Sequence, residues 1–382
     1  MRKFYTAKRI IQLSVLFCFL LIPVNIKAQA HVYVNPPTTN LSGQSSVTID
    51  FMISNVTNLH SYSVKVRFDN SILSYQTAVK GPFLTNVVNG TAFFTSPNPI
   101  IDSVEVAEAI LGPYAVNGSG KLFSITFNVL SAGNSTIDIA AVLLRDLNNA
   151  DIPVTWSSGE VIVPVSVNAK VILQGPFSIN IMNTNLNSFG HLPLVQPYSG
   201  TPWNYSGTET VPAGFFSTHS NIVDWTLVEL RTGTGASTIV ERKAGFITNN
   251  GIIVNIDGVS PLYFSELKGN YYLVIYQRNH IPIMSSNSAY LDYVSTQYDF
   301  TTSQSKAFGT NPMKDLGGGF FGAYTGDSDG SGTVNAADRS NTWNQRNLSG
   351  YFGTDVDLSG TVNAADRSVI WNNRNLSTQV PN

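Results

Sequence analysis

A phrase of twelve residues occurs twice near the C-terminus, with a spacing of 28 positions. The copies are residues 327–338 (DSDGSGTVNAAD) and residues 355–366 (DVDLSGTVNAAD). Both place oxygen-bearing residues at positions 1, 3, 5, 7, 9 and 12, the spacing with which a loop of this length surrounds calcium. Gly332 and Gly360 occupy position 6, where the chain of such a loop turns sharply and a side chain would obstruct it.

The two copies predict two calcium ions as cofactors, each held by six residues. In each loop, positions 1, 3 and 5 offer side-chain oxygens, position 7 a backbone carbonyl, position 9 a water-mediated contact and position 12 a closing carboxylate. The candidate ligands are Asp327, Asp329, Ser331, Thr333, Asn335 and Asp338 in the first loop and Asp355, Asp357, Ser359, Thr361, Asn363 and Asp366 in the second. Clusters of Asp, Asn, Ser and Gly also occur in ordinary exposed turns, but the repetition favours the metal sites.

A helix is expected after each loop, because residues 338–347 and 366–375 echo one another. Trp343 and Trp371 stand at equivalent places in these two segments. We expect them to form the small core that a unit of about 60 residues requires. The alternative is that they anchor a partner, since aromatic residues dominate interface hot spots.

A loop followed by a helix, duplicated within residues 325–382, resembles the layout of dockerins. The resemblance implies calcium-dependent folding and calcium-dependent docking onto a protein that bears a cohesin. It also implies that loop positions 10 and 11 and the following helix contact this partner. The residues concerned are Ala336, Ala337, Arg339, Ala364, Ala365 and Arg367. Well-known dockerins often carry hydroxyl or larger residues in place of these alanines, which leaves the identity of the partner open.

The first thirty residues resemble a signal peptide, with a basic start, an apolar stretch over residues 10–24 and small residues at Ala28 and Ala30. This predicts a secreted protein, extracellular or associated with the cell surface. The apolar stretch is short for a membrane span, and Cys18, the only cysteine, lies within it. Removal of this segment would leave 17 basic residues against 24 acidic ones, which argues against nucleic acid as a partner.

Residues 31–166 alternate between apolar and polar side chains, which predicts a β-sandwich. Residues 61–69 (SYSVKVRFD), Ile72-Leu73 and residues 120–129 (GKLFSITFNV) are similar in order and period to cohesin modules and their carbohydrate-binding relatives. The resemblance implies a jelly-roll sandwich that receives a dockerin-bearing protein. Two alternatives stay open, namely a sandwich that binds polysaccharide directly and a spacer that binds nothing.

Residues 167–308 predict a second sandwich of immunoglobulin-like type, with strands at residues 222–230 and 271–276. Three consecutive glycines within residues 309–324 favour a flexible linker before the last module. The expected fold class is therefore mainly β, with two β-sandwiches followed by a small helical module.

No catalytic residue is predicted. The five histidines, at positions 31, 60, 191, 219 and 280, have no metal-ligand spacing. Glu105 and Glu108 are close in sequence, but on a strand they would face opposite sides as solvated side chains. The sequence thus favours a non-catalytic assembly protein linked to extracellular polysaccharide. An extracellular hydrolase with an unrecognised site in residues 167–308 remains an alternative.

Overall fold

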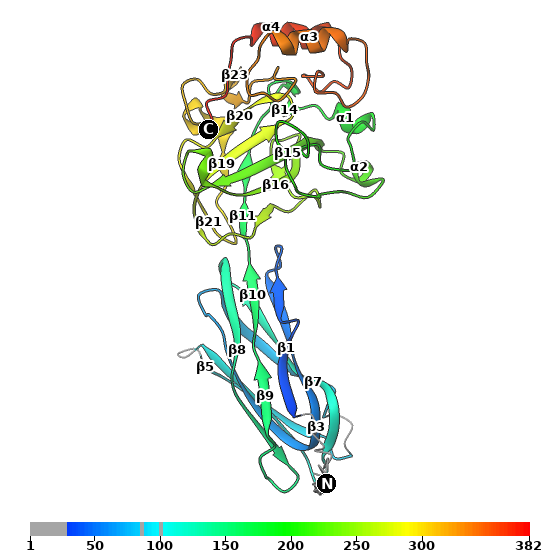
Figure 1. The fold of residues 1–382 in the computed structure, drawn as a ribbon, viewed down its shortest axis with the longest axis vertical. Helices are drawn as coiled ribbons and strands as arrows, with labels where there is room; N and C mark the ends of the chain where they lie inside the picture. The colour runs from blue at the N-terminus through cyan, green and yellow to red at the C-terminus, as the bar shows by residue number, and fades with distance from the viewer. Residues whose placement is uncertain (1–28, 85–87, 99–101) are drawn as a thin grey trace, which may run out of the picture.

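The computed structural model describes residues 29–84, 88–98 and 102–382, so that residues 1–28 of the predicted signal peptide lie outside the described part. The protein is mainly β, as the sequence predicts, and elongated (Figure 1). The N-terminal sandwich occupies one end, and helices α3 (Ala336–Asn344) and α4 (Ala364–Asn372) cover the other. In the described residues, no helix combines the length and apolar character needed to cross a bilayer.

The N-terminal sandwich is organised around β3 (Ser46–Arg67), a strand of 22 residues that belongs to both layers. Its first half lies between β1 and β7, and its second half lies between β6 and β8. Between the halves, Asn55 and Asn58 adopt positive φ angles of 58° and 60°, a conformation that asparagine tolerates better than most residues. The remaining strands are β1 (Ala30–Asn35), β2 (Thr38–Asn40), β4 (Leu73–Lys80), β5 (Thr91–Asn98), β6 (Ser103–Ile110), β7 (Val116–Val129), β8 (Gly133–Asp146), β9 (Val154–Ser157) and β10 (Gly159–Val163).

The core of this sandwich forms from the inward residues of the alternating strands. Phe51 and Phe123 stack with ring centroids 4.5 Å apart, and both are fully buried. Glu105 and Glu108 face opposite sides of β6, as expected, but Glu108 is not solvated. It is buried and accepts hydrogen bonds from Tyr62 Oη (3.0 Å) and Thr91 Oγ1 (2.6 Å), so that each carboxylate oxygen has a donor.

The second β region is built on β15 (Ile222–Arg231), the middle strand of the order β17-β16-β15-β19-β20. Every residue of β15 is buried, so both of its faces are covered, although its sequence alternates. The other strands of this sheet are β16 (Ile239–Thr248), β17 (Ile253–Val254), β19 (Gly269–Gln277), β20 (His280–Met284) and β21 (Ala289–Leu291). The short elements around it are β11 (Val165–Val167), β12 (Ala169–Lys170), β13 (Phe177–Ser178), β14 (Ile181–Met182), β18 (Leu262–Phe264), β22 (Tyr298–Asp299), α1 (Asn185–Ser188), α2 (Phe215–Thr218) and the 3-10 helices Ala236–Thr238, Phe300–Thr302 and Gln304–Lys306.

The junction between the two β regions is short and held by polar contacts. Only Pro164 separates β10 from β11. The Asp292 carboxylate accepts hydrogen bonds from the backbone N–H of Ala132 (2.6 Å) and from Ser131 Oγ (2.9 Å), and Lys268 Nζ donates to the same Ser131 Oγ (2.9 Å). Tyr293 packs against the hydrophobic cores of both regions. These contacts fix the two regions to one another.

The segment 309–324 differs from the flexible linker that its glycines suggest. It contains a hairpin of β23 (Lys314–Gly317) and β24 (Phe320–Gly322), flanked by the buried Met313 and Ala323. Residues 317–319 all have positive φ angles, between 61° and 84°, so the last residue of β23 and the two turn residues use the conformational freedom of glycine. The same residue type that disfavours a strand is needed here to reverse the chain.

Candidate metal centres and the helical face

Three carboxylates converge in each of the two C-terminal loops. Oxygens of Asp327, Asp329 and Asp338 lie within 4.8 Å of one another, and oxygens of Asp355, Asp357 and Asp366 do the same. Each triad joins positions 1, 3 and 12 of its loop, as the spacing predicts. The two triads could each hold a metal ion.

The first loop also brings in positions 5 and 7. Ser331 Oγ lies 3.3 Å from Asp327 Oδ1 and 3.3 Å from the carbonyl oxygen of Thr333. The backbone N–H of Gly332 donates to Asp327 Oδ2 at 2.8 Å, which folds the loop around the carboxylate. Gly332 has a φ of 81°, so the sharp turn at position 6 uses the conformational freedom of glycine.

The second loop repeats this arrangement almost contact for contact. Ser359 Oγ lies 3.4 Å from Asp355 Oδ1 and 3.2 Å from the carbonyl oxygen of Thr361. The backbone N–H of Gly360 donates to Asp355 Oδ2 at 2.8 Å, and Gly360 has a φ of 88°. Two segments 28 residues apart therefore present the same set of oxygens.

The residue that closes each loop also takes part in the N-terminal cap of the following helix. Asp338 Oδ1 accepts from the backbone N–H of Ser328 (2.7 Å), and Oδ2 accepts from the backbone N–H of Asn335 (2.8 Å). Asn335 is the N-cap of α3: its side chain accepts from the backbone N–H of Ala337 (2.7 Å) and from that of Asp338, and the latter bond completes a capping box. Asn363 and Asp366 repeat this box at α4. Position 9 thus has a capping role that its ligand spacing did not predict.

In each triad the carboxylates of positions 1 and 12 are buried, whereas Asp329 at position 3 of the first loop is exposed and Asp357 is half-buried. Burial raises the pKa of Asp327 to about 7, assisted by the charges of Asp338 and Asp329 and opposed by the Gly332 N–H bond. Burial likewise raises the pKa of Asp355 to about 7 and that of Asp366 to about 6. In the described residues, no lysine or arginine forms an ion pair with any of the six carboxylates. Clustered hard oxygens with unbalanced charge fit a hard divalent cation such as calcium.

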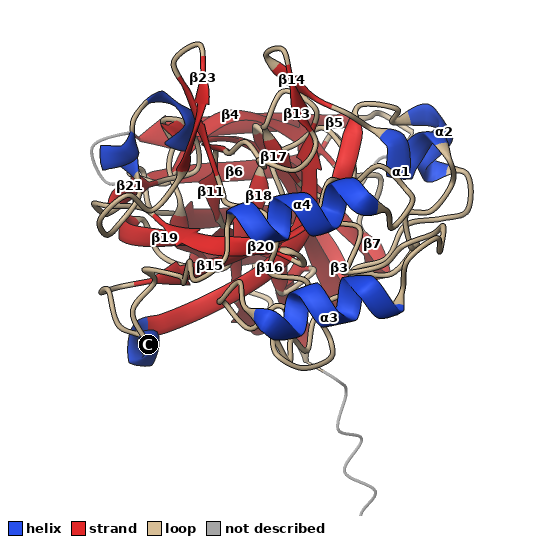
Figure 2. Ribbon diagram, turned by 90° about the horizontal axis from the view of Figure 1, so that it is seen from above, coloured by secondary structure: helices blue, strands red, loops and turns tan. Residues whose placement is uncertain are grey.

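The alanines and arginines that the sequence assigns to a partner surface lie on α3 and α4. Ala336, Ala337, Ala364, Ala365 and Arg339 are exposed, and Arg367 is half-buried. In Figure 2 the two helices lie side by side on the outer surface of the molecule.

The two tryptophans are not in the core, contrary to the expectation, because Trp343 is 50% and Trp371 is 49% exposed. The small core consists instead of Val334, Val356, Ile370 and Ile281. Ile281 belongs to β20 of the second β region, so that region supplies part of the core that the loops and helices lack. Because of this contribution, the tryptophans are free to remain on the surface.

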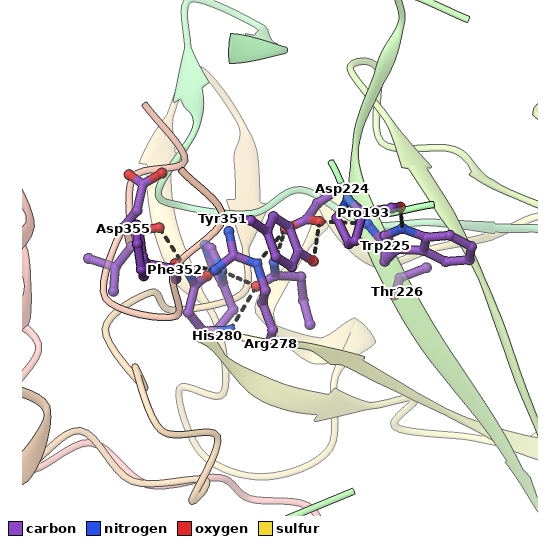
Figure 3. Close-up of polar contacts among 12 residues, drawn as sticks. Pro193, Asp224, Trp225, Thr226, Arg278, His280, Tyr351, Phe352 and Asp355 are labelled. Atoms are coloured by element: carbon purple, nitrogen blue, oxygen red, sulfur yellow. Dashed lines mark hydrogen bonds and ion pairs between the residues drawn. The ribbon is translucent and has the colours of Figure 1, made fainter. Parts of the chain in front are cut away.

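A buried polar network joins the second β region to the second loop (Figure 3). Arg278 Nε donates to Asp224 Oδ2 at 2.9 Å, and its guanidinium lies 4.1 Å from the centre of the Tyr351 ring. Arg278 also donates to the carbonyl oxygen of Phe352, and Asn279 Nδ2 donates to the carbonyl oxygen of Asp355 at 2.7 Å. The backbone of a predicted ligand is therefore held by residues that lie more than 70 positions earlier.

Leu358 fixes the same loop from its other side. It occupies position 4, where the first loop has Gly330, and it joins the hydrophobic core of the second β region with 1% of its surface exposed. Its φ of 55° is one that few leucines adopt, so packing must outweigh the backbone strain. Neither Leu358 nor Arg278 was predicted as part of the site. The sequence did contain a signal for Leu358, because position 4 is a glycine in the first copy and a leucine in the second.

The N-terminal sandwich offers no comparable cluster among its described residues. Its exposed large aromatic residues, Phe94, Tyr114 and Trp156, belong to β5, to the loop before β7 and to β9. Because β5 and β9 are not neighbouring strands, Phe94 and Trp156 do not form a continuous aromatic row.

No protein-family model and no curated protein matches the sequence. Solved structures similar to it include a non-cellulosomal cohesin from the hyperthermophilic archaeon Archaeoglobus fulgidus, 16% identical, over 35% of this chain and 91% of that chain, with a TM-score of 0.30. A type II cohesin domain from the cellulosome of Acetivibrio cellulolyticus is 16% identical over 35% of this chain and 95% of that chain, with a TM-score of 0.31. A chain from a type I cohesin–dockerin complex of Clostridium thermocellum has 14% sequence identity over 35% of this chain and 92% of that chain, with a TM-score of 0.31.

Proposed function

We propose that this protein is a secreted, non-catalytic assembly protein whose C-terminal module binds two calcium ions and docks onto a protein partner. The observation that carries the proposal is the duplicated set of converging oxygens in residues 327–338 and 355–366. Chance produces one acidic turn easily, but it does not reproduce the same hydrogen bonds around two carboxylate triads in which positions 1 and 12 are buried.

Calcium binding and the shape of the docking face are coupled in this proposal. Asp338 and Asp366 each contribute to a triad and to the capping box of the adjacent helix. An ion in the loop neutralises the repulsion within the triad and so stabilises the geometry that starts α3 or α4. The outer face of these helices is then presented in a fixed form. The resemblance of the loops to dockerins identifies the proposed partner as a cohesin-bearing protein, in a system that handles extracellular polysaccharide.

Calorimetric titration of calcium chloride into residues 31–382 tests the metal sites. The whole mature chain is used because Ile281 and Leu358 join the module to the second β region. We expect two ions per chain. Asp327→Asn and Asp355→Asn should each remove one, whereas Asp315→Asn, an exposed change on β23, should leave both. Absence of binding by the unaltered chain would remove the basis of the proposal.

Docking is tested by titrating purified cohesin modules into the same protein, with calcium and with a chelator. The expected result is binding in calcium that the chelator abolishes. Sedimentation velocity of the chain alone tests a related hypothesis, namely that its N-terminal sandwich receives the C-terminal module of a second copy. A monomer at every concentration in calcium would exclude self-assembly and leave docking onto other proteins intact.

A further inference from the structure

The outer face of α3 and α4 carries two interlocked stacks of arginine on tryptophan. The guanidinium carbons of Arg346 and Arg367 lie 4.5 Å from the centre of the Trp343 ring. Those of Arg339 and Arg374 lie 4.9 Å and 4.3 Å from the centre of the Trp371 ring. Each tryptophan therefore receives one arginine from its own segment and one from the other helix. We call these six residues the Arg/Trp face.

The arginines of this face keep most of their hydrogen-bonding capacity. Arg346 Nη1 donates to the carbonyl oxygen of Trp343, and Arg374 Nη1 donates to that of Trp371, both at 2.8 Å. Among the described residues, the guanidinium groups of Arg339 and Arg367 have no hydrogen-bond partner and lie over the tryptophan rings. Ion pairs to the four arginines are also absent from the described part of the chain. A guanidinium has five N–H donors, so these groups remain available to an incoming acceptor.

The charge of the face is opposite to that of the whole chain. Four positive charges gather here, although the full sequence has a formal net charge of −2. The acidic residues of the two helices, Asp338 and Asp366, are buried and engaged in the loops. A shallow depression of about 610 Å³ runs between the helices, and its lining includes Ala336, Arg339, Trp343 and Arg367. The small side chain of Ala336 leaves both arginines accessible from outside.

Stacking also decides which carrier of negative charge fits. Tryptophan recognises sugars through the flat surface of its ring, but here two guanidinium groups lie over each ring. A stacked guanidinium still presents its N–H edge outward, in the fork geometry that binds a carboxylate through two hydrogen bonds. The exposed rim of each tryptophan adds apolar contact area of the kind found at interface hot spots.

We propose that the Arg/Trp face binds an acidic protein surface, with Arg339 and Arg367 as the carboxylate-binding residues. The inference rests on the proposed docking function and specifies the chemistry of the partner: Asp and Glu side chains gathered on a folded protein or peptide. Acidic polysaccharide is the competing ligand that the test must separate.

The test measures binding of fluorescently labelled poly-L-glutamate to residues 31–382 in calcium at low salt, by anisotropy. Polygalacturonate serves as the acidic sugar polymer. We expect poly-L-glutamate to bind, and Arg339→Gln/Arg367→Gln to weaken binding at least tenfold. The control Arg67→Gln/Arg145→Gln removes the same charge from the N-terminal sandwich and should change binding less than twofold. Arg339→Lys/Arg367→Lys keeps the charge but loses the two-pronged donor geometry of guanidinium, so its affinity for poly-L-glutamate should lie between those of the unaltered chain and the glutamine variant.

Several results would overturn the inference. These are no binding of poly-L-glutamate, equal weakening by the control pair, or tighter binding of polygalacturonate. Thermal unfolding of Arg339→Gln/Arg367→Gln in calcium checks the possibility that the stacks only hold the helices together, since loss of helix would explain weaker binding without a contact. Calcium titration of the same sample separates the two proposals. Two bound ions without poly-L-glutamate binding would refute only this inference, whereas absence of calcium binding would refute the proposed function.

Discussion

Replacing Asp327 by asparagine should stabilise the protein without calcium and lose most of that advantage in calcium. Without an ion, burial raises the pKa of Asp327 from 3.8 to about 7. Between these two pH values the folded chain holds a proton that the unfolded chain has lost, so stability falls as the pH rises through this window. Asparagine carries no charge, so the variant escapes this loss.

The size of the effect follows from the shift in pKa. A change of about three units corresponds to roughly 4 kcal/mol at pH values above 7. Asp327 is fully buried, so solvent screens little of this cost. Asparagine has one oxygen where aspartate accepts from both Gly332 and Ser331, and the lost hydrogen bond costs about 1 kcal/mol. A net gain of about 3 kcal/mol at pH 7.5, and a gain near zero at pH 4, is the expected outcome.

The free energy of unfolding of residues 31–382 is measured by urea titration, with circular dichroism as the signal. The conditions are pH 4 and pH 7.5 with a chelator, and pH 7.5 with calcium. Calcium at about one hundred times its dissociation constant adds about 2.7 kcal/mol per occupied site to the unaltered chain. The variant loses this contribution at the first site, which reverses much of its advantage. Asp315→Asn is the matched control and should behave as the unaltered chain. Equal stability of Asp327→Asn and the unaltered chain in chelator at pH 7.5 would refute the electrostatic argument.

Two further changes test how the second β region supports the second loop. Leu358→Ala should lower the free energy of unfolding by about 2–5 kcal/mol and weaken calcium binding at that loop, because Leu358 fills a core that cannot fully collapse around the smaller residue. Leu348→Ala, at a residue that is 43% exposed, should change stability by less than about 0.5 kcal/mol in the same urea titration. Arg278→Met should cost about 3–5 kcal/mol because it leaves the buried Asp224 carboxylate without its ion pair. Adding Asp224→Asn should recover part of that loss, and a double variant no more stable than Arg278→Met would show that the charge is not the cause.

The convergence of the loop carboxylates could be predicted because the residues concerned are local in sequence. All six candidate ligands of a loop lie within twelve consecutive residues, so their spacing carries the geometry. The repeat at 28 residues then separated this pattern from an ordinary polar turn. The mainly β fold was predictable for a similar reason, since strand alternation is also read within a few residues.

The support of the loops could not be predicted, because it depends on contacts between distant segments. Arg278 donates a hydrogen bond to Phe352, 74 positions later in the sequence, and Asn279 donates one to Asp355, 76 positions later. The exposure of Trp343 also depends on a distant segment. Ile281 fills part of the small core that we expected the tryptophans of the module to fill. A local signal for the Arg/Trp face did exist: in both copies an arginine follows the tryptophan by three residues, just beyond the end of α3 or α4.

The single residue between β10 and β11 has a consequence for any complex that the chain forms. Flexible tethers let two bound partners sample many separations, and their mutual effective concentration then depends on the length of the tether. Here Pro164, the Asp292 contacts and the shared packing of the C-terminal module leave no such slack between the first sandwich and the helical face. If partners bind at both ends, as proposed, they would keep nearly one distance and one relative orientation about the long axis, so that the chain would fix their geometry as well as connect them.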